Sequence, residues 1–220
     1  MFEAYAEYFW IALFAAIVLY GLANAIQVPL VVKKFYQRLG FTDHGESTFS
    51  DEPLQGSELL HGLQTAGFYA GTYRGHRVTQ CAAQSVDRRK FTLNKVTRKR
   101  NQLLWTITTV ECAAPLPEFC ARPTRVADAP AYILQQQGVV FPDDESFANK
   151  VHVVAKDHAA IRGLFTLFLR ERLNGIDPVS LESAGSVLIY KSPRLPHDAG
   201  STLEKDLNLV VDIAEHIATQ

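Results

Sequence analysis

The chain has 220 residues and the composition of a globular protein, with 20% charged and 10% aromatic residues. Its net charge of −1 is unevenly distributed, because seven basic residues and no acidic one lie between Arg88 and Arg100, and the rest of the chain carries −8. Three cysteines (Cys81, Cys112, Cys120) are an odd number, and their spacing is unlike that of a zinc ribbon or a CxxC pair. We therefore expect reduced thiols in a reducing compartment.

A segment of 24 residues without a charge, Phe9–Val32, dominates the N-terminal part of the chain. As a helix rising about 1.5 Å per residue, it is long enough for a hydrocarbon layer of about 30 Å. Core helices seldom run so long without a charge. A cleaved signal peptide needs a basic leader, whereas the charges in residues 1–8 are acidic. We expect a retained transmembrane helix; cleavage after Ala25, at a small-x-small sequence, is the alternative.

The flanking charges predict the orientation of this helix. Lys33, Lys34 and Arg38 follow it and no basic residue precedes it, so the N-terminus is expected outside and the large domain inside. The expected division is an external N-terminus at 1–8, a transmembrane helix at 9–32, a juxtamembrane linker at 33–62 and a soluble domain at 63–220. The layout is that of small single-pass proteins of the bacterial inner membrane.

Polar and small residues in the membrane segment predict contact with other membrane helices. Amides are costly in hydrocarbon and usually face a partner helix or the interface, and small residues let helices approach closely. The expected contact residues are Ala12, Ala16, Gly21, Asn24, Ala25 and Gln27.

The first half of the soluble part reads as β-structure after a polar linker. Residues 68–73 and 77–82 alternate like strands on either side of a turn that contains Gly75, which tolerates positive φ. A second strand pair is expected at 90–96 and 103–112. The second member of that pair is rich in β-branched and aromatic residues, and a basic turn at 97–101 joins the two.

The second half is more regular after a proline-rich loop at Ala113–Ala131. Residues 151–155 read as a short buried strand, and Asp157 is the expected N-cap of a helix that runs to about Leu173. A hairpin follows at 179–182 and 187–191, and a capping box at Ser201 opens the last amphipathic helix. The predicted fold class is α+β: one transmembrane helix, then a mainly antiparallel sheet with helices packed on one face.

The basic run is the first candidate interaction surface. It consists of Arg88, Arg89, Lys90, Lys95, Arg98, Lys99 and Arg100. Close to a negatively charged cytoplasmic leaflet, such a run is attracted to anionic lipid headgroups. An acidic protein subunit would fit it equally well, and a solvated hairpin that protects an edge strand is the structural alternative. Nucleic acid is not an expected partner, because no recognisable binding module surrounds the charges.

Candidates for chemistry are weak. His152, Asp157 and His158 lack a metal-binding spacing, and Asp157 already has a capping role. Cys120 as a nucleophile would need a neighbouring base and a lowered pKa. No phosphate-binding glycine loop or nucleophile elbow occurs in the sequence, so no cofactor, metal or catalytic residue is expected.

These patterns predict a non-enzymatic accessory or assembly subunit of a larger membrane complex. It would dock through its transmembrane helix and its basic surface, and its partners would be other membrane protein subunits. The rival hypothesis is a membrane-tethered enzyme or ligand-binding domain whose site is built from loops such as Ala113–Ala131.

Overall fold

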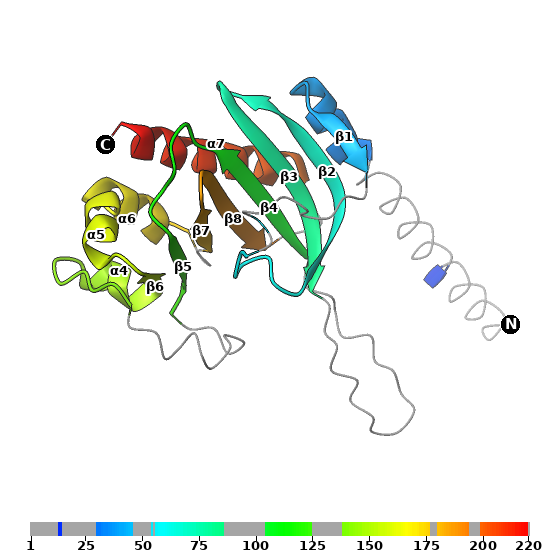
Figure 1. The fold of residues 1–220 in the computed structure, drawn as a ribbon. Helices are drawn as coiled ribbons and strands as arrows, with labels where there is room; N and C mark the ends of the chain where they lie inside the picture. Colours follow the sequence, from blue (N-terminus) through cyan, green and yellow to red (C-terminus); the bar gives the residue numbers. More distant parts are fainter. Residues whose placement is uncertain are drawn as a thin grey trace, which may run out of the picture.

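The computed structural model describes residues 13–14, 30–45, 54, 56–85, 104–124, 138–176, 180–193 and 199–219. Eight antiparallel strands form one sheet in the order β1-β2-β3-β4-β8-β7-β5-β6 (Figure 1). The strands are β1 (Thr42–Gly45), β2 (Leu63–Tyr73), β3 (His76–Ser85), β4 (Leu104–Glu111), β5 (Phe119–Pro123), β6 (Val151–Ala155), β7 (Leu181–Ala184) and β8 (Val187–Pro193).

The named helices all contribute to one large core on a single face of this sheet. They are α4 (Glu145–Lys150), α5 (His158–Leu164), α6 (Leu167–Asn174) and α7 (Ala199–Ala218). The long helix α7 packs against β4 and β8, and the shorter helices gather near β5 and β6 (Figure 1). The predicted α+β class, a mainly antiparallel sheet with helices on one face, is confirmed for the described residues.

A smaller core lies on the opposite face of the sheet. It includes Phe68 from β2, Cys81 from β3, Ile107 from β4 and Ile189 from β8. Leu60 closes it from the turn segment 56–62, which we call the strap. The sheet is therefore apolar on both faces at its centre, and a segment without regular structure protects the second face from water.

Several local predictions are confirmed. The turn between β2 and β3 has positive φ at both central residues, Arg74 (50°) and Gly75 (85°), the requirement of a type I′ hairpin. Asp157 caps α5 by accepting hydrogen bonds from the amides of Ala159 and Ala160. The apolar residues of α7 are buried at the predicted spacing: Leu203, Leu207, Val210, Val211, Ala214 and Ile217.

The helix predicted to run from Asp157 to Leu173 is two helices. Residue Phe165 ends α5 with φ −82° and ψ 63°, and Thr166 then caps α6 through its hydroxyl. The ring of Phe165 is fully buried against Phe119 and Phe141. The apolar periodicity continues across the break, so it could not reveal the change of direction.

Two further predictions need correction. Part of the expected linker 33–62 belongs to the fold: residues 30–38 are helical, Thr42–Gly45 form β1, and the strap covers the second core. The loop expected at Ala113–Ala131 contains β5, which lies between β7 and β6 in the sheet. Its proline, Pro123, is the last residue of the strand and pairs with Val151 of β6, beyond the part of β5 that pairs with β7.

The predicted strand at 90–96 and the basic turn at 97–101 lie outside the described residues, and β4 pairs with β3 and β8. Among the residues that the structure describes, no helix combines the length and the apolar character of a membrane span. Most of Phe9–Val32 falls outside those residues.

Candidate functional site

The interaction residues predicted from the sequence lie outside the part of the chain that the structure describes, so they stay predictions. These are the membrane-helix residues Ala12, Ala16, Gly21, Asn24, Ala25 and Gln27, and the basic run Arg88, Arg89, Lys90, Lys95, Arg98, Lys99 and Arg100. The described residues instead offer three candidate sites: the segment 30–41, the outer surface of α7, and a buried polar cluster beneath the strap.

The first site is the segment 30–41, which we call the junction because it joins the last residues of the uncharged stretch, 30–32, to the domain. Its helix, residues 30–38, is amphipathic. Val32, Phe35 and Tyr36 are buried in the main core, whereas Lys33 and Lys34 are exposed. This spacing of i, i+3 and i+4 is that of a helix with one apolar face. The chain therefore leaves the uncharged segment and enters the domain core without a free tether between them.

Tyr36 fixes the junction to the sheet. Its hydroxyl donates a 2.7 Å hydrogen bond to Oε1 of Gln80 on β3, and both side chains are buried. The Gln80 amide in turn donates to Oγ1 of Thr108 on β4 at 2.8 Å. The Tyr36 ring stacks on Tyr69 of β2 with centroids 3.9 Å apart. Aromatic burial and a satisfied polar chain both favour one defined position of this helix.

A glycine makes room for the end of the junction. A Cβ atom on Gly71 of β2 would lie 2.5 Å from Cδ1 of Phe41 and 3.1 Å from its Cα. Phe41 is buried and stacks beside Tyr36 at 5.8 Å. The absence of a side chain at Gly71 is thus what allows the chain after the helix to lie directly on the sheet.

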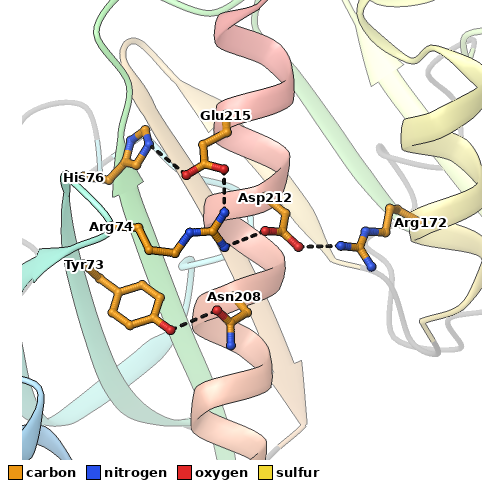
Figure 2. A network of polar contacts seen from close by, with 7 residues as sticks. All are labelled: Tyr73, Arg74, His76, Arg172, Asn208, Asp212 and Glu215. Atoms are coloured by element: carbon orange, nitrogen blue, oxygen red, sulfur yellow. Dashed lines mark hydrogen bonds and ion pairs between the residues drawn. The ribbon is translucent and has the colours of Figure 1, made fainter.

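The second site is a network of polar side chains on the outer surface of α7 (Figure 2). Arg74, at the tip of the β2–β3 hairpin, donates to Asp212 and Glu215 of α7, each at 2.6 Å. Asp212 also accepts from Arg172 of α6, and Tyr73 donates to Asn208 at 2.9 Å. The network therefore ties the hairpin, α6 and α7 together.

The backbone of Arg74 indicates that this network is structural. A residue other than glycine at positive φ is disfavoured by about 1–2 kcal/mol, and two carboxylates offset that cost by holding its guanidinium. These ion pairs are partly exposed, with 25–40% of each side chain accessible. Exposed pairs contribute roughly 0–1 kcal/mol each. The arrangement is a clamp between elements, in which both carboxylates are already neutralised.

An open hollow lies beside this clamp. It is lined by Phe168, Arg172, Asp212, Glu215, His216 and Thr219. Phe168 is 46% exposed and its neighbour Leu167 is 58% exposed. The ring of His216 lies 4.6 Å from that of Phe168, and its Nε2 is 2.9 Å from the hydroxyl of Thr166. The hollow presents an aromatic surface with paired charges, and its depth is small.

The third site is centred on Glu182 of β7, a buried carboxylate under the strap. It accepts hydrogen bonds from the hydroxyl of Ser57 (2.8 Å), the amide of Glu58 (3.0 Å) and the amide of Leu59 (2.9 Å). Amide groups at the start of a turn bind anions in this way. Glu182 thus acts as an internal anion that fastens the strap to the sheet.

Basic groups complete this buried cluster. Arg122 of β5 pairs with Glu58 and donates to the sulfur of Cys120 at 3.3 Å. Lys191 of β8 lies 4.5 Å from the ring centroid of Trp105. Burial lowers the pKa of Lys191. Each charge in the cluster therefore has a partner from another element, as buried charges require.

The cysteine of this cluster and the other candidates for chemistry are not activated. Burial raises the pKa of the Cys120 thiol to about 12, although Arg122 acts in the opposite direction. Burial also raises the pKa of Cys81 to about 12. A nucleophilic cysteine needs the opposite shift. Burial lowers the pKa of His152, the histidine beside Gly138. Within the described residues, no group of three or more metal-binding side chains comes together.

None of these three sites was predicted from the sequence, and the reasons differ between the junction and the Glu182 cluster. The junction does carry a sequence signal: apolar residues recur at helical spacing opposite Lys33 and Lys34, namely Val32, Phe35, Tyr36 and Leu39. The predicted boundary between membrane span and linker falls between residues 32 and 33 and cuts across this pattern. The Glu182 cluster carries no such signal. A lone acid in a short strand gives no indication that a segment 125 residues earlier will bind it.

Comparisons with known proteins define the fold but not a family. No protein-family model matches the chain, and no curated protein matches it. Among solved structures, it is similar to the crystal structure of the mycobacterial trehalose monomycolate transport factor A, TtfA. The TM-score is 0.55 at 11% sequence identity, and the match covers 84% of this chain and 92% of that chain. At this identity, the likeness shows that the two chains share a fold.

Proposed function

We propose that this protein is a membrane-anchored accessory subunit of a bacterial membrane complex and that it acts by binding rather than by catalysis. In this proposal the uncharged segment that begins at Phe9 crosses the inner membrane and leaves it before Val32, which is buried in the domain core. The α+β domain lies on the cytoplasmic side, where Lys33, Lys34 and Arg38 would be retained.

One observation carries the proposal: the junction is part of the domain core. A domain on a loose tether samples many orientations, whereas burial of Val32, Phe35 and Tyr36 joins this domain directly to the end of the uncharged segment. A fixed domain below a membrane helix is suited to presenting a surface to a neighbouring subunit. This arrangement would contribute nothing to a freely diffusing enzyme.

The fold that this chain shares with a solved structure is the basis for inferring what its partner complex does. One solved structure that shares this fold is named a trehalose monomycolate transport factor. We infer by analogy that the partner complex of this protein works in transport across or within the membrane. The analogy concerns the role alone and transfers no residue.

The described ionisable groups favour binding over catalysis. The buried thiols of Cys81 and Cys120 have raised pKa values. Asp212 and Glu215 are held by Arg74 in a structural clamp. The rival hypothesis of an enzyme with a site at Ala113–Ala131 is weakened further, because β5 is a paired strand of the sheet.

Purification of the tagged full chain from native membranes in mild detergent tests this proposal. We expect membrane subunits to co-purify, and mass spectrometry would identify them. Replacing Asn24 and Gln27 by leucine should reduce recovery of the partners, whereas the conservative change Val18→Leu should not. Migration of the wild-type chain as an unaccompanied monomer would contradict the proposal.

A second variant separates the two predicted docking elements. Replacing Arg98, Lys99 and Arg100 by glutamine removes three charges from the basic run without touching the membrane segment. Loss of partners in this variant alone would assign docking to the soluble domain. Loss in the Asn24 and Gln27 variant alone would assign it to the membrane helix.

A further inference from the structure

The outward face of the junction helix is the surface from which this inference starts. Opposite the buried Val32, Phe35 and Tyr36, the helix exposes Lys33 and Lys34. Gln37 and Arg38 complete this face and are also exposed, so it carries three positive charges and no negative one.

These cations are not neutralised within the described part of the protein. Every ion pair found there involves other residues, such as Arg74 with Asp212 or Arg170 with Asp143. The guanidinium of Arg38 lies 5.9 Å from the ring centroid of Phe35, a contact that leaves its charge unpaired. The helix thus presents a cationic surface that complements an anionic one.

Apolar residues border the cationic surface where the chain enters the domain. Leu30 is 51% exposed and Val31 is 50% exposed. They are the last residues of the uncharged stretch, and Lys33 and Lys34 follow at once. Exposed aliphatic residues next to lysines are the pattern of a segment at the boundary between acyl chains and headgroups.

We propose that this face of the junction lies against the anionic headgroups of the leaflet and sets the orientation of the whole domain. The inference rests on the proposed function, because it requires the uncharged segment to be in the membrane. Lys33 follows that segment directly, and Arg38 lies about 7.5 Å further along a helix that rises 1.5 Å per residue. All three cations therefore lie within about 10 Å of the end of the uncharged segment, and about 10 Å is the Debye length at 0.1 M salt.

The core packing of the junction extends this local contact to the domain. Residues 30–38 cannot rotate independently, because Tyr36 is hydrogen-bonded to Gln80 and stacked on Tyr69. Lipid contact at Lys33 and Lys34 therefore places the β1 edge of the sheet near the leaflet (Figure 1). The β6 edge lies seven strand spacings away, about 33 Å along the sheet.

Spin labels on the full-length chain in vesicles test this orientation. The labels are placed at Gln37→Cys in the junction and, as a matched control, at Ala148→Cys on α4 near β6; both sites are exposed. Cys112, the half-buried thiol, is replaced by serine, and the other two cysteines are buried. Vesicles of phosphatidylcholine, with or without about 30% phosphatidylglycerol, carry a nickel-chelating lipid that relaxes nearby labels.

We expect the label at position 37 to relax more strongly than the label at 148, and the difference to be largest in anionic vesicles. Replacing Lys33, Lys34 and Arg38 by glutamine should lower relaxation at position 37 by about twofold or more, as should raising the salt to about 0.5 M. Circular dichroism of this exposed-residue variant checks that it folds.

Several outcomes would overturn the inference. Equal relaxation at the two positions would show that the domain does not face the leaflet by this edge. If relaxation of the label at position 37 did not depend on lipid charge or on the glutamine substitutions, the proposed contact with anionic headgroups would be refuted. Crosslinking of Lys33 and Lys34 to an acidic protein in native membranes would assign the face to a protein partner. Failure of the chain to sediment with vesicles would instead refute the proposed membrane anchoring.

Discussion

Replacing Tyr36 by phenylalanine tests whether the junction is held in the core. The change removes the hydroxyl that donates to Gln80 at 2.7 Å and keeps the ring that stacks on Tyr69. Tyr36 is 2% exposed and Gln80 is fully buried. Water therefore cannot readily replace the lost donor, and a buried acceptor left without it costs about 1–3 kcal/mol. The predicted loss in unfolding free energy is of that size.

Thermal unfolding of the full chain in detergent, followed by circular dichroism, measures this loss. In a domain of this size, each kcal/mol lowers Tm by about 2–4 °C. Amide hydrogen exchange should show faster opening of residues 30–45 than of β3 and β4. The matched control is Tyr73→Phe, which removes a hydroxyl bonded to Asn208 at the half-buried clamp. Because water can reach that position, its effect should stay below about 1 kcal/mol.

Equal stability of the two variants would contradict this prediction. Unchanged exchange of residues 30–45 in Tyr36→Phe would contradict it as well. Either result would mean that the junction is not fastened through this bond, and the fixed orientation on which the proposed function depends would lose its main support.

Three further predictions concern other parts of the domain. Gly71→Ala places a Cβ 2.5 Å from the ring of Phe41 and should cost about 1–3 kcal/mol in a thermal melt, because the neighbour must move. Glu182→Gln leaves one strap amide, that of Glu58 or of Leu59, facing an NH₂ group. It should cost about 2–4 kcal/mol and open residues 56–62 to proteolysis. Burial raises the pKa of Asp206 to about 6 from an ordinary value near 3.8. Between these pH values the folded state binds more protons than the unfolded state, so the free energy of unfolding should fall as pH rises through that window. Asp206→Asn should be more stable than wild type by up to about 3 kcal/mol at neutral pH. Near pH 4 the two proteins should be similarly stable.

Matched controls distinguish these effects from general perturbation. Gly163→Ala, in α5, meets no atom within 4 Å and should stabilise the helix by about 0.5–1 kcal/mol. Glu204→Gln changes an exposed carboxylate on α7, so its unfolding midpoint should match wild type across the pH range. Destabilisation by Gly163→Ala, or a loss at Glu204 equal to that at Glu182, would contradict the structural assignments.

The orientation of the domain connects the fold to the proposed role. If the junction fixes the β1 edge near the leaflet, α7 and the hollow beside Phe168 face a defined direction relative to the membrane. A neighbouring subunit would then meet the same surface in every copy of the complex. This is the property expected of an accessory protein that positions a partner.

The sequence by itself determined those features that depend on neighbouring residues. The Arg74-Gly75 turn, the Asp157 cap and the apolar face of α7 follow from turn geometry, capping and periodicity, which act within a few residues. They were predicted and are present. The α+β class followed from their order along the chain.

Only the tertiary structure decided how distant segments satisfy one another. Tyr36 and Gln80 are 44 residues apart, and Ser57 and Glu182 are 125 apart. Whether a tyrosine after an uncharged segment is solvated or buried depends on the partner that the fold brings to it. The break at Phe165 has the same origin, because tertiary burial of its ring overrides a local periodicity that continues unchanged. Local chemistry thus specified the elements, whereas burial of apolar and polar groups by remote residues made the junction and the strap part of the domain.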